Sequence, residues 1–250
     1  MTLKLNLAVH GYSGAGKSRL LRTAPGPIVT LDAEGGTKWL SGPDSTTEPW
    51  DVGRPMPTTN KDGSPIHTNT LVPVIVRSPD DPKRLLDILM SGQHYFETVE
   101  WDSVTDVQQR YKKGIRGLSE AMTMELWGKL LDQMVDVVRA YRDLTDHTKP
   151  VNVIMSAITV EKGKNNTRLE PDLQGALGGK FPQYFDVLGY LYPELITDET
   201  GGQHIERRML IQPWGEFVAK DRTDTLTQRY GLYIPNPNLT TILAVLNGEA

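Results

Sequence analysis

The sequence predicts an α/β fold with a mostly parallel sheet, helices on both of its faces and an antiparallel hairpin at one edge. Short apolar segments alternate with helical ones, which is typical of parallel sheets that are covered on both sides. A glycine-rich turn follows the first of these segments and leads into a helical one. Late in the chain, two strand-like segments flank Gly201-Gly202, as the strands of a β-hairpin do.

In the first half of the chain, apolar alternation and β-branched runs predict strands, and the segments between them predict helices. The expected strands are residues 5–10, 28–32, 71–76 and 98–102, and the expected helices are residues 17–22 and 82–90. Residues 41–70 are rich in Pro, Gly, Thr and Asp and show no sustained period, so they are expected to form a long irregular insertion.

The second half of the chain predicts further helices, a fifth strand and the hairpin. Gly114 and Gly117 are expected to break a helical region that starts near Thr105. The longer helix that follows has one apolar face. The remaining expected elements are a helix over residues 120–144, a strand over 151–155, hairpin strands over 184–192 and 205–213, and a helix over 239–246. Because no repeat or linker interrupts residues 1–250, a single domain is expected.

The composition excludes several kinds of site. The chain has no cysteine, which excludes disulfides and thiolate metal sites. No apolar run has the length of a membrane span, and the first residues lack the apolar stretch of a signal peptide, so a cytoplasmic protein without membrane partners is expected. The net charge of −4 argues mildly against a polyanion ligand, although a local basic patch is sufficient for phosphate contacts.

Residues 11–18 carry the most specific motif of the sequence. They match G-x-x-x-x-G-K-[ST] at each fixed position, between an expected strand and an expected helix. Glycines let backbone N–H groups line an anion nest, Lys17 reaches the β- and γ-phosphates, and the Ser18 hydroxyl joins Mg²⁺. The residues expected to contact the nucleotide are Gly11, Tyr12, Ser13, Gly14, Ala15, Gly16, Lys17 and Ser18. The motif therefore predicts ATP and Mg²⁺ as ligands.

Two acidic residues are expected to complete this site from the ends of other strands. Asp102 ends the fourth strand and is the expected acidic ligand of Mg²⁺; in an alternative interpretation it caps the helix that starts near Thr105. Glu34 follows the second strand, where a carboxylate is placed to orient the water that attacks the γ-phosphate. The alternative for Glu34 is a surface turn with incidental acidic residues.

Together these features resemble the RecA-type recombinase ATPases and, more narrowly, the phage-encoded RecA-like proteins of single-strand annealing and recombination. The resemblance covers residues 5–225 and rests on the P-loop, Asp32-Ala33-Glu34, Asp102-Ser103 and the late Lys220-Asp221-Arg222. It implies a RecA-like core, Glu34 as the catalytic base, and a Mg²⁺-dependent ATPase that DNA stimulates and that acts in phage DNA annealing or recombination. It also implies single-stranded DNA and a phage single-strand-binding protein as partners, in the cytoplasm of the host cell.

The resemblance further implies an assembly of several subunits. RecA-type enzymes place two basic residues of a neighbouring subunit against the γ-phosphate, and Lys220 and Arg222 lie where that motif falls. A homo-oligomer, either a ring or a filament, is therefore expected, and the alternative for these residues is a solvated charged turn. At Ser156 the sequence departs from the recombinases, which often have an amide there that couples ATP to DNA.

Two loops are expected to contact DNA phosphates without reading bases, in the regions where RecA-like proteins bind DNA. The first carries Lys162, Lys164 and Arg168. The second carries Lys180 next to Phe181, whose ring is expected to stack on a base. Taken alone, each loop is also explained as an ordinary solvated segment.

Two other functions are compatible with the same motifs. One is a DNA translocase, helicase or nuclease-associated motor on the same core, which directional unwinding would reveal. The other is a nucleotide-switched DNA-binding protein with little turnover, which DNA affinities measured with and without ATP would reveal.

Overall fold

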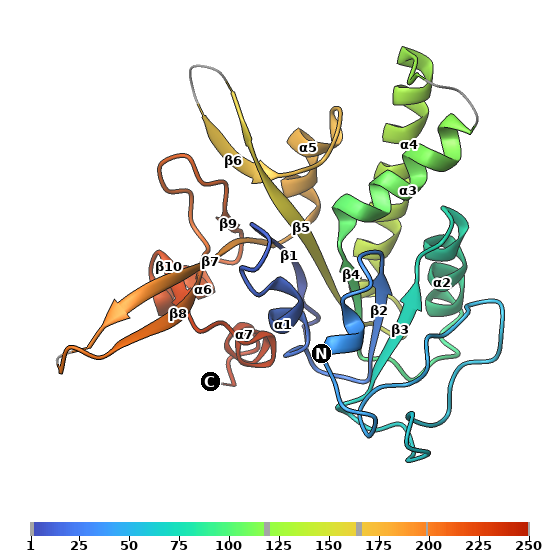
Figure 1. The fold of residues 1–250 in the computed structure, drawn as a ribbon, viewed down its shortest axis with the longest axis horizontal. Helices are drawn as coiled ribbons and strands as arrows, with labels where there is room; N and C mark the ends of the chain where they lie inside the picture. Colours follow the sequence, from blue (N-terminus) through green and yellow to red (C-terminus); the bar gives the residue numbers. More distant parts are fainter. Residues whose placement is uncertain (1–2, 118–120, 164–166, 199, 250) are drawn as a thin grey trace.

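The computed structural model describes residues 3–117, 121–163, 167–198 and 200–249. Its ten-stranded sheet has the order β10-β8-β7-β1-β5-β4-β2-β3, with β6 paired to β5 and β9 paired to β7 (Figure 1). The strands are β1 (Asn6–Gly11), β2 (Ile28–Asp32), β3 (Leu71–Ile75), β4 (Thr98–Asp102), β5 (Asn152–Lys162), β6 (Arg168–Pro171), β7 (Val187–Thr197), β8 (Gln203–Leu210), β9 (Lys220–Asp221) and β10 (Tyr233–Pro235). From β7 to β3 neighbouring strands run parallel, which confirms the predicted fold class.

Helices cover both faces of the sheet because side chains along each strand alternate between the two sides. One face packs against α2, α3, α4 and α5 through residues such as Val99 and Trp101, and the other packs against α1, α6 and α7 through residues such as Leu7 and Ile154. The helices are α1 (Lys17–Leu21), α2 (Asp80–Met90), α3 (Val104–Arg116), α4 (Met124–Arg142), α5 (Leu177–Lys180), α6 (Thr225–Tyr230) and α7 (Leu239–Leu246), with 3₁₀ turns η1 (Thr37–Trp39), η2 (Asp143–Asp146) and η3 (Phe181–Tyr184). Within the described parts of the chain, no helix combines the length and apolar character needed to cross a membrane.

The predicted edge hairpin is confirmed. Strands β7 and β8 pair antiparallel from Tyr190 opposite Leu210 to Thr197 opposite Gln203. The outer part of this hairpin projects beyond the rest of the protein, at the lower left of Figure 1. Strand β10 then pairs with β8 and completes this edge of the sheet.

The predicted helix break at Gly114 is wrong, because α3 continues through this residue to Arg116, and Gly117 is its C-cap. A Cβ at Gly114 would lie only 2.6 Å from Cγ of Pro79, at the start of α2. The glycine therefore permits a close approach of two helices rather than a break in one. Gly117 has a φ of 57° and is the residue at which α3 stops.

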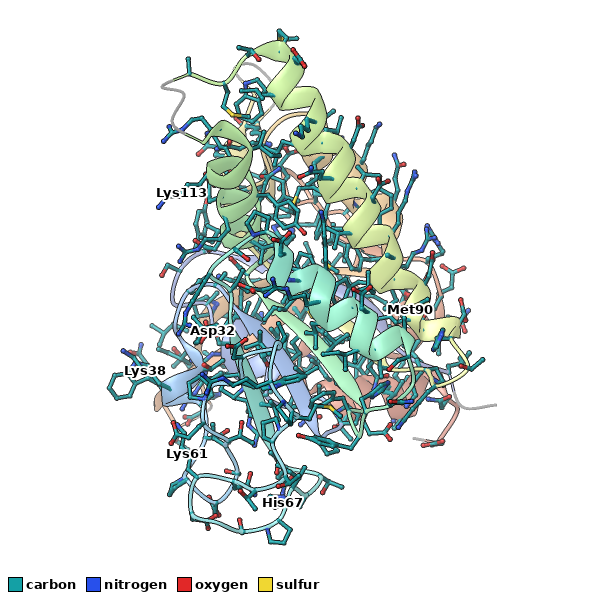
Figure 2. The ribbon with its side chains drawn as sticks, turned by 90° about the vertical axis from the view of Figure 1, so that its right-hand side faces the viewer. Asp32, Lys38, Lys61, His67, Met90 and Lys113 are labelled. Carbon is teal, nitrogen blue, oxygen red and sulfur yellow. The ribbon has the colours of Figure 1, made fainter. Side chains whose placement is uncertain are left out.

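Residues 41–70 contain neither a helix nor a multi-residue strand, only turns and isolated bridges. Figure 2 shows this segment around Lys61 and His67, below the sheet. It is attached to the rest of the protein by Thr46, which bridges to Leu71, and by Trp50, whose buried ring lies 6.1 Å from that of Phe96. The irregular backbone thus contributes an aromatic side chain to the core.

Candidate nucleotide site

The P-loop joins β1 to α1 at the carboxyl edge of the parallel strands. Gly14 and Gly16 have φ angles of 81° and 101°, which glycine adopts without the cost that a side chain would bring. The turn is closed by the amide of Ala15, which donates to the carbonyl of Tyr12 at 3.2 Å. Helix α1 begins at Lys17, directly after the loop. The amino end of this helix therefore adjoins the loop, and both can offer backbone amides to a phosphate group.

The Lys17 side chain is folded onto its own loop. Its Nζ donates to the carbonyl oxygens of Gly11 at 2.9 Å and Tyr12 at 3.1 Å, and the residue is only 8% exposed. Burial lowers the pKa of Lys17, while the nearby carboxylates, with Glu34 the largest contributor, oppose this shift. The amine is therefore a cation held within the phosphate-binding loop.

Asp102 lies beside Ser18, although the two residues are far apart in the sequence. The Ser18 hydroxyl donates to Oδ2 of Asp102 at 2.6 Å, and the Ser156 hydroxyl donates to Oδ1 at 2.7 Å. Ser156 is on β5, which lies between β1 and β4, so each oxygen of the carboxylate accepts from one hydroxyl. Hydroxyl and carboxylate oxygens are ligands that Mg²⁺ takes in combination with phosphate oxygens, and the donor set fits this ion.

The N-cap of α3 is Ser103 and not Asp102, so the capping interpretation of Asp102 is wrong. The Ser103 oxygen accepts from the amide of Asp106 at 3.4 Å, and its hydroxyl donates to Oδ2 of Asp106 at 2.6 Å. The cap leaves both oxygens of Asp102 turned toward Ser18 and Ser156. The peptide bond between Asp102 and Ser103 is cis.

Glu34 is carried by a turn that the buried Asp32 organises. Oδ1 of Asp32 accepts from the amides of Gly35 at 2.5 Å and Gly36 at 3.2 Å, and its Oδ2 accepts from the amide and the hydroxyl of Thr37. The turn is further tied to β4 by the amide of Ala33, which donates to the carbonyl of Asp102 at 2.9 Å. Asp32 lies at the carboxyl end of β2, as Figure 2 shows. The first acid of the Asp32-Ala33-Glu34 motif thus positions the third residue.

The carboxyl group of Glu34 faces the other acids of the site, although the residue as a whole is exposed. Partial burial of the carboxyl raises the pKa of Glu34, and the like charges of Asp102 and Asp106 act in the same direction. A hydrogen bond with Ser103 opposes the increase. A carboxylate with a raised pKa is a stronger base, so this environment suits proton transfer from a water molecule.

Lys220 and Arg222 lie away from the P-loop of the same chain. In β9, Asp221 pairs with Val187, which in turn pairs with Leu7 of β1. Leu7 precedes the P-loop by four residues, which corresponds to about 13 Å along a strand. Arg222 forms an ion pair with Asp186 at 3.3 Å and donates to the carbonyl of Gln183 at 3.2 Å, and Lys220 donates to the carbonyl of Pro182 at 2.6 Å.

The first predicted DNA loop is part of a β-hairpin. Strand β5 extends to Lys162, past the predicted end at residue 155, and β6 pairs antiparallel with it from Pro171 to Arg168. Lys162 forms an ion pair with Glu170 at 2.8 Å and donates to the carbonyl of Leu173 at 3.1 Å, whereas Arg168 is exposed. Lys164 lies outside the described residues.

In the second predicted DNA loop, the expectation that Phe181 stacks on a base is wrong. Its ring is fully buried, with its centroid 4.8 Å from that of Phe185. Lys180, the last residue of α5, is exposed. Helix α5 lies beside the β5–β6 hairpin (Figure 1), and Nζ of Lys162 would lie 3.1 Å from a Cβ on Gly178. The exposed cations of the two segments therefore belong to one region of the surface.

Asp32 and Ser156 hold the other site residues in place, a role that was not predicted for them from the sequence. Ser156 fixes Asp102, and Asp32 shapes the turn of Glu34. Their positions in the chain were the only sequence signal for these roles. Ser156 is on β5, between β1 and β4, and Asp32 is on β2, next to β4. Side chains at the carboxyl ends of neighbouring parallel strands lie close together.

Comparison with protein families adds one finding. A family model described as "AAA domain" matches residues 3–223. A comparison with curated proteins finds no match.

Proposed function

Because the chain belongs to this family of AAA domains, a type of P-loop ATPase domain, we propose that it binds ATP with Mg²⁺ at residues 11–18 and hydrolyses it. The observation that carries the proposal is the 2.6 Å hydrogen bond between Ser18 and Asp102. It places the last residue of the P-loop motif against an acid from another strand, as a Mg²⁺ site in a P-loop ATPase requires.

In the proposed mechanism, Lys17 exchanges its two carbonyl acceptors for the β- and γ-phosphate oxygens of ATP. These contacts replace hydrogen bonds that the amine already makes, so no buried donor is left unpaired when the nucleotide leaves. Ser18 and Asp102 hold Mg²⁺, which neutralises charge on the β- and γ-phosphates when bound.

Glu34 acts as the general base of the proposed reaction. The turn that Asp32 organises places its carboxyl beside Ser103 and Asp106, on the side of Asp102 that faces away from β5. From there it orients a water molecule toward the γ-phosphate and accepts a proton as the water attacks.

The proposal extends to single-stranded DNA as the macromolecular ligand and to phage DNA annealing or recombination as the process, in the cytoplasm of the host cell and together with a phage single-strand-binding protein. Support comes from the resemblance to RecA-type recombinases and from the exposed cations Arg168 and Lys180 on neighbouring segments. Exposed cations without base-reading partners favour binding to phosphates regardless of sequence.

A homo-oligomer is part of the same proposal. Lys220 and Arg222 contact residues 182–186 instead of the P-loop of the same chain, and the Arg222 side chain is 59% exposed. In an oligomer, these two cations would therefore contact the γ-phosphate bound at the P-loop of a neighbouring subunit, as arginine fingers do.

The test combines ATP turnover with a DNA gel-shift series. Purified protein is expected to hydrolyse ATP with Mg²⁺ and not with EDTA, to bind single-stranded DNA in preference to duplex, and to hydrolyse ATP faster when the single strand is present. Directional unwinding of a duplex would favour a motor, and ATP-dependent DNA affinity without turnover would favour a switch. Absence of both ATP binding and ATP turnover would refute the proposal.

A further inference from the structure

A cavity of about 180 Å³ lies beside the P-loop, on the side of β1 that faces β7 and β8. Its lining includes two cations and no carboxylate. The lining residues are Gly16, Arg19, Leu20, Thr23, Leu191, Arg207, Asn236 and Pro237. This charge pattern favours an electron-rich ligand, and the shared residue Gly16 makes the cavity continuous with the phosphate-binding loop.

Arg207 lies directly over the P-loop. A Cβ on Gly16 would lie 2.5 Å from Nε of Arg207 and 2.9 Å from its Cδ, so the guanidinium group approaches the loop as closely as glycine permits. Its Nε is buried and has no hydrogen-bond partner among the described residues. A buried donor of a charged group without a partner is costly, and such groups are often those that a ligand satisfies.

The backbone of Arg207 is held rigidly, which fixes the origin of its side chain. Its amide donates to Oδ1 of Asn236 at 3.3 Å, and the amide of Asn236 donates back to its carbonyl at 2.6 Å. Asn236 has a φ of 42°, a conformation that turns the chain back toward β8 directly after β10. The contact thus belongs to the pairing of β8 with β10.

The next residue of β8, Arg208, differs from Arg207 because carboxylates pair with its guanidinium. Arg208 forms ion pairs with Glu206 at 2.6 Å and Glu194 at 3.5 Å, and its guanidinium lies 4.5 Å from the ring centroid of Tyr233. Successive side chains of a strand point to opposite faces, so Arg208 lies on the face away from Arg207. One arginine is therefore neutralised within the fold, and the other lies in the cavity with no carboxylate in its lining.

The orientation of a bound nucleotide follows from the strand order. Asp102 and Glu34 come from β4 and the end of β2, which both lie on the β5 side of β1. The γ-phosphate and Mg²⁺ must point to that side, so the nucleoside end of the molecule leaves the loop on the side of β7 and β8. The cavity beneath Arg207 lies there.

We infer that this cavity is the nucleoside subsite and that Arg207 contacts the ribose or base of ATP. The inference rests on the proposed function. The planar guanidinium is suited to donate to ribose and base oxygens or nitrogens and to stack on a base, and Leu191 and Pro237 give the cavity an apolar surface for the ring.

The test compares ATP with inorganic triphosphate, which lacks the nucleoside, as ligands of the wild type and of Arg207→Gln. Calorimetry with Mg²⁺ should show ATP affinity about tenfold lower in the variant, the scale of one hydrogen bond to a charged group, with triphosphate affinity within about twofold of wild type. Arg208→Gln is the matched control from the same strand and should leave the affinities for both ligands unchanged. If Arg207→Gln does not fold, Arg207→Lys keeps the charge and loses the planar group, and it should show the same selective loss.

Two results would overturn the inference. An equal loss for ATP and triphosphate would mean that Arg207 acts on the phosphates, and unchanged ATP affinity would mean that it does not contact the nucleotide. Both results presuppose a wild type that binds ATP, and a wild type that does not bind ATP contradicts the proposed function itself.

Discussion

His10 ends β1 directly before the P-loop, and replacing it with glutamine should change how the stability of the protein depends on pH. Nε2 of His10 lies 2.7 Å from the carbonyl oxygen of Val218, so this nitrogen carries the proton, and Nδ1 accepts from the Thr159 hydroxyl at 2.9 Å. The residue is fully buried. The ring is therefore held in its neutral form by contacts that a second proton would break.

Burial lowers the pKa of His10 from 6.5 to about 4, against a weaker opposing effect of its hydrogen bond to Val218. Between these values the unfolded chain binds a proton that the folded protein does not, so stability decreases as the pH falls from 6.5 toward 4. The integrated effect between pH 7 and pH 5 is about 2 kcal/mol. His10→Gln keeps a donor for Val218 but cannot be protonated, so it abolishes this contribution.

Urea denaturation at pH 7, 6 and 5 measures the effect as the difference in unfolding free energy between wild type and variant. The variant should be less stable by about 1 kcal/mol at pH 7, because Thr159 loses its acceptor, and the difference should shift in favour of the variant by about 2 kcal/mol at pH 5. A second histidine provides a comparison for this pH dependence. His94 is 5% exposed, and burial also lowers its pKa to about 4. A difference for His10→Gln that does not change with pH would refute the assignment of a buried neutral histidine.

Three further predictions concern the proposed activity. Glu34→Gln should retain ATP binding and slow hydrolysis by about two orders of magnitude, measured as turnover at saturating ATP, and reduced affinity with normal turnover would exclude Glu34 as the base. Replacing the exposed cations Arg168 and Lys180 with glutamine should reduce the slope of log affinity against log salt for single-stranded DNA by about 1.4 units, and an unchanged slope would place the DNA site elsewhere. A variant with alanine at Lys220 and Arg222 should be nearly inactive alone and should regain ATPase activity when mixed with a P-loop variant; a co-assembled but inactive mixture would contradict a role across subunits.

The P-loop and its neighbouring acids could be predicted because each sequence signal has a local physical cause. Glycines at positions 14 and 16 are needed for positive φ angles, and a strand and a helix flank the motif in the chain. The carboxyl ends of parallel strands meet at one edge, so Asp102 and Glu34 could be placed near Lys17 once the strands were recognised.

Other features depended on contacts that the local sequence does not show. Gly114 reads as a helix breaker, yet it permits the approach of Pro79. Phe181 stands in a glycine-rich polar segment, yet its ring is buried against Phe185. The position of Arg207 over Gly16 is set by the pairing of β8 with β10, and no pattern within either segment predicts it.

The β5–β6 hairpin was missed for a related reason. Residues 159–162 mix polar and apolar side chains, and the strand they form is stabilised by pairing with Arg168 to Pro171 rather than by an apolar face of its own. Strand propensity in such a segment is decided by its cross-strand partners.

The central claim is that residues 11–18 bind a nucleoside triphosphate through Lys17, and calorimetric titration of ATP with Mg²⁺ tests it most directly. Lys61→Ala is the control, because Lys61 is an exposed lysine on the irregular segment of residues 41–70 (Figure 2). The account predicts saturable binding to the wild type and to Lys61→Ala, and no measurable binding to Lys17→Ala, because the lost amine is the cation held within the loop. Wild-type affinity in a folded Lys17→Ala variant, or no binding to the wild type, would contradict it.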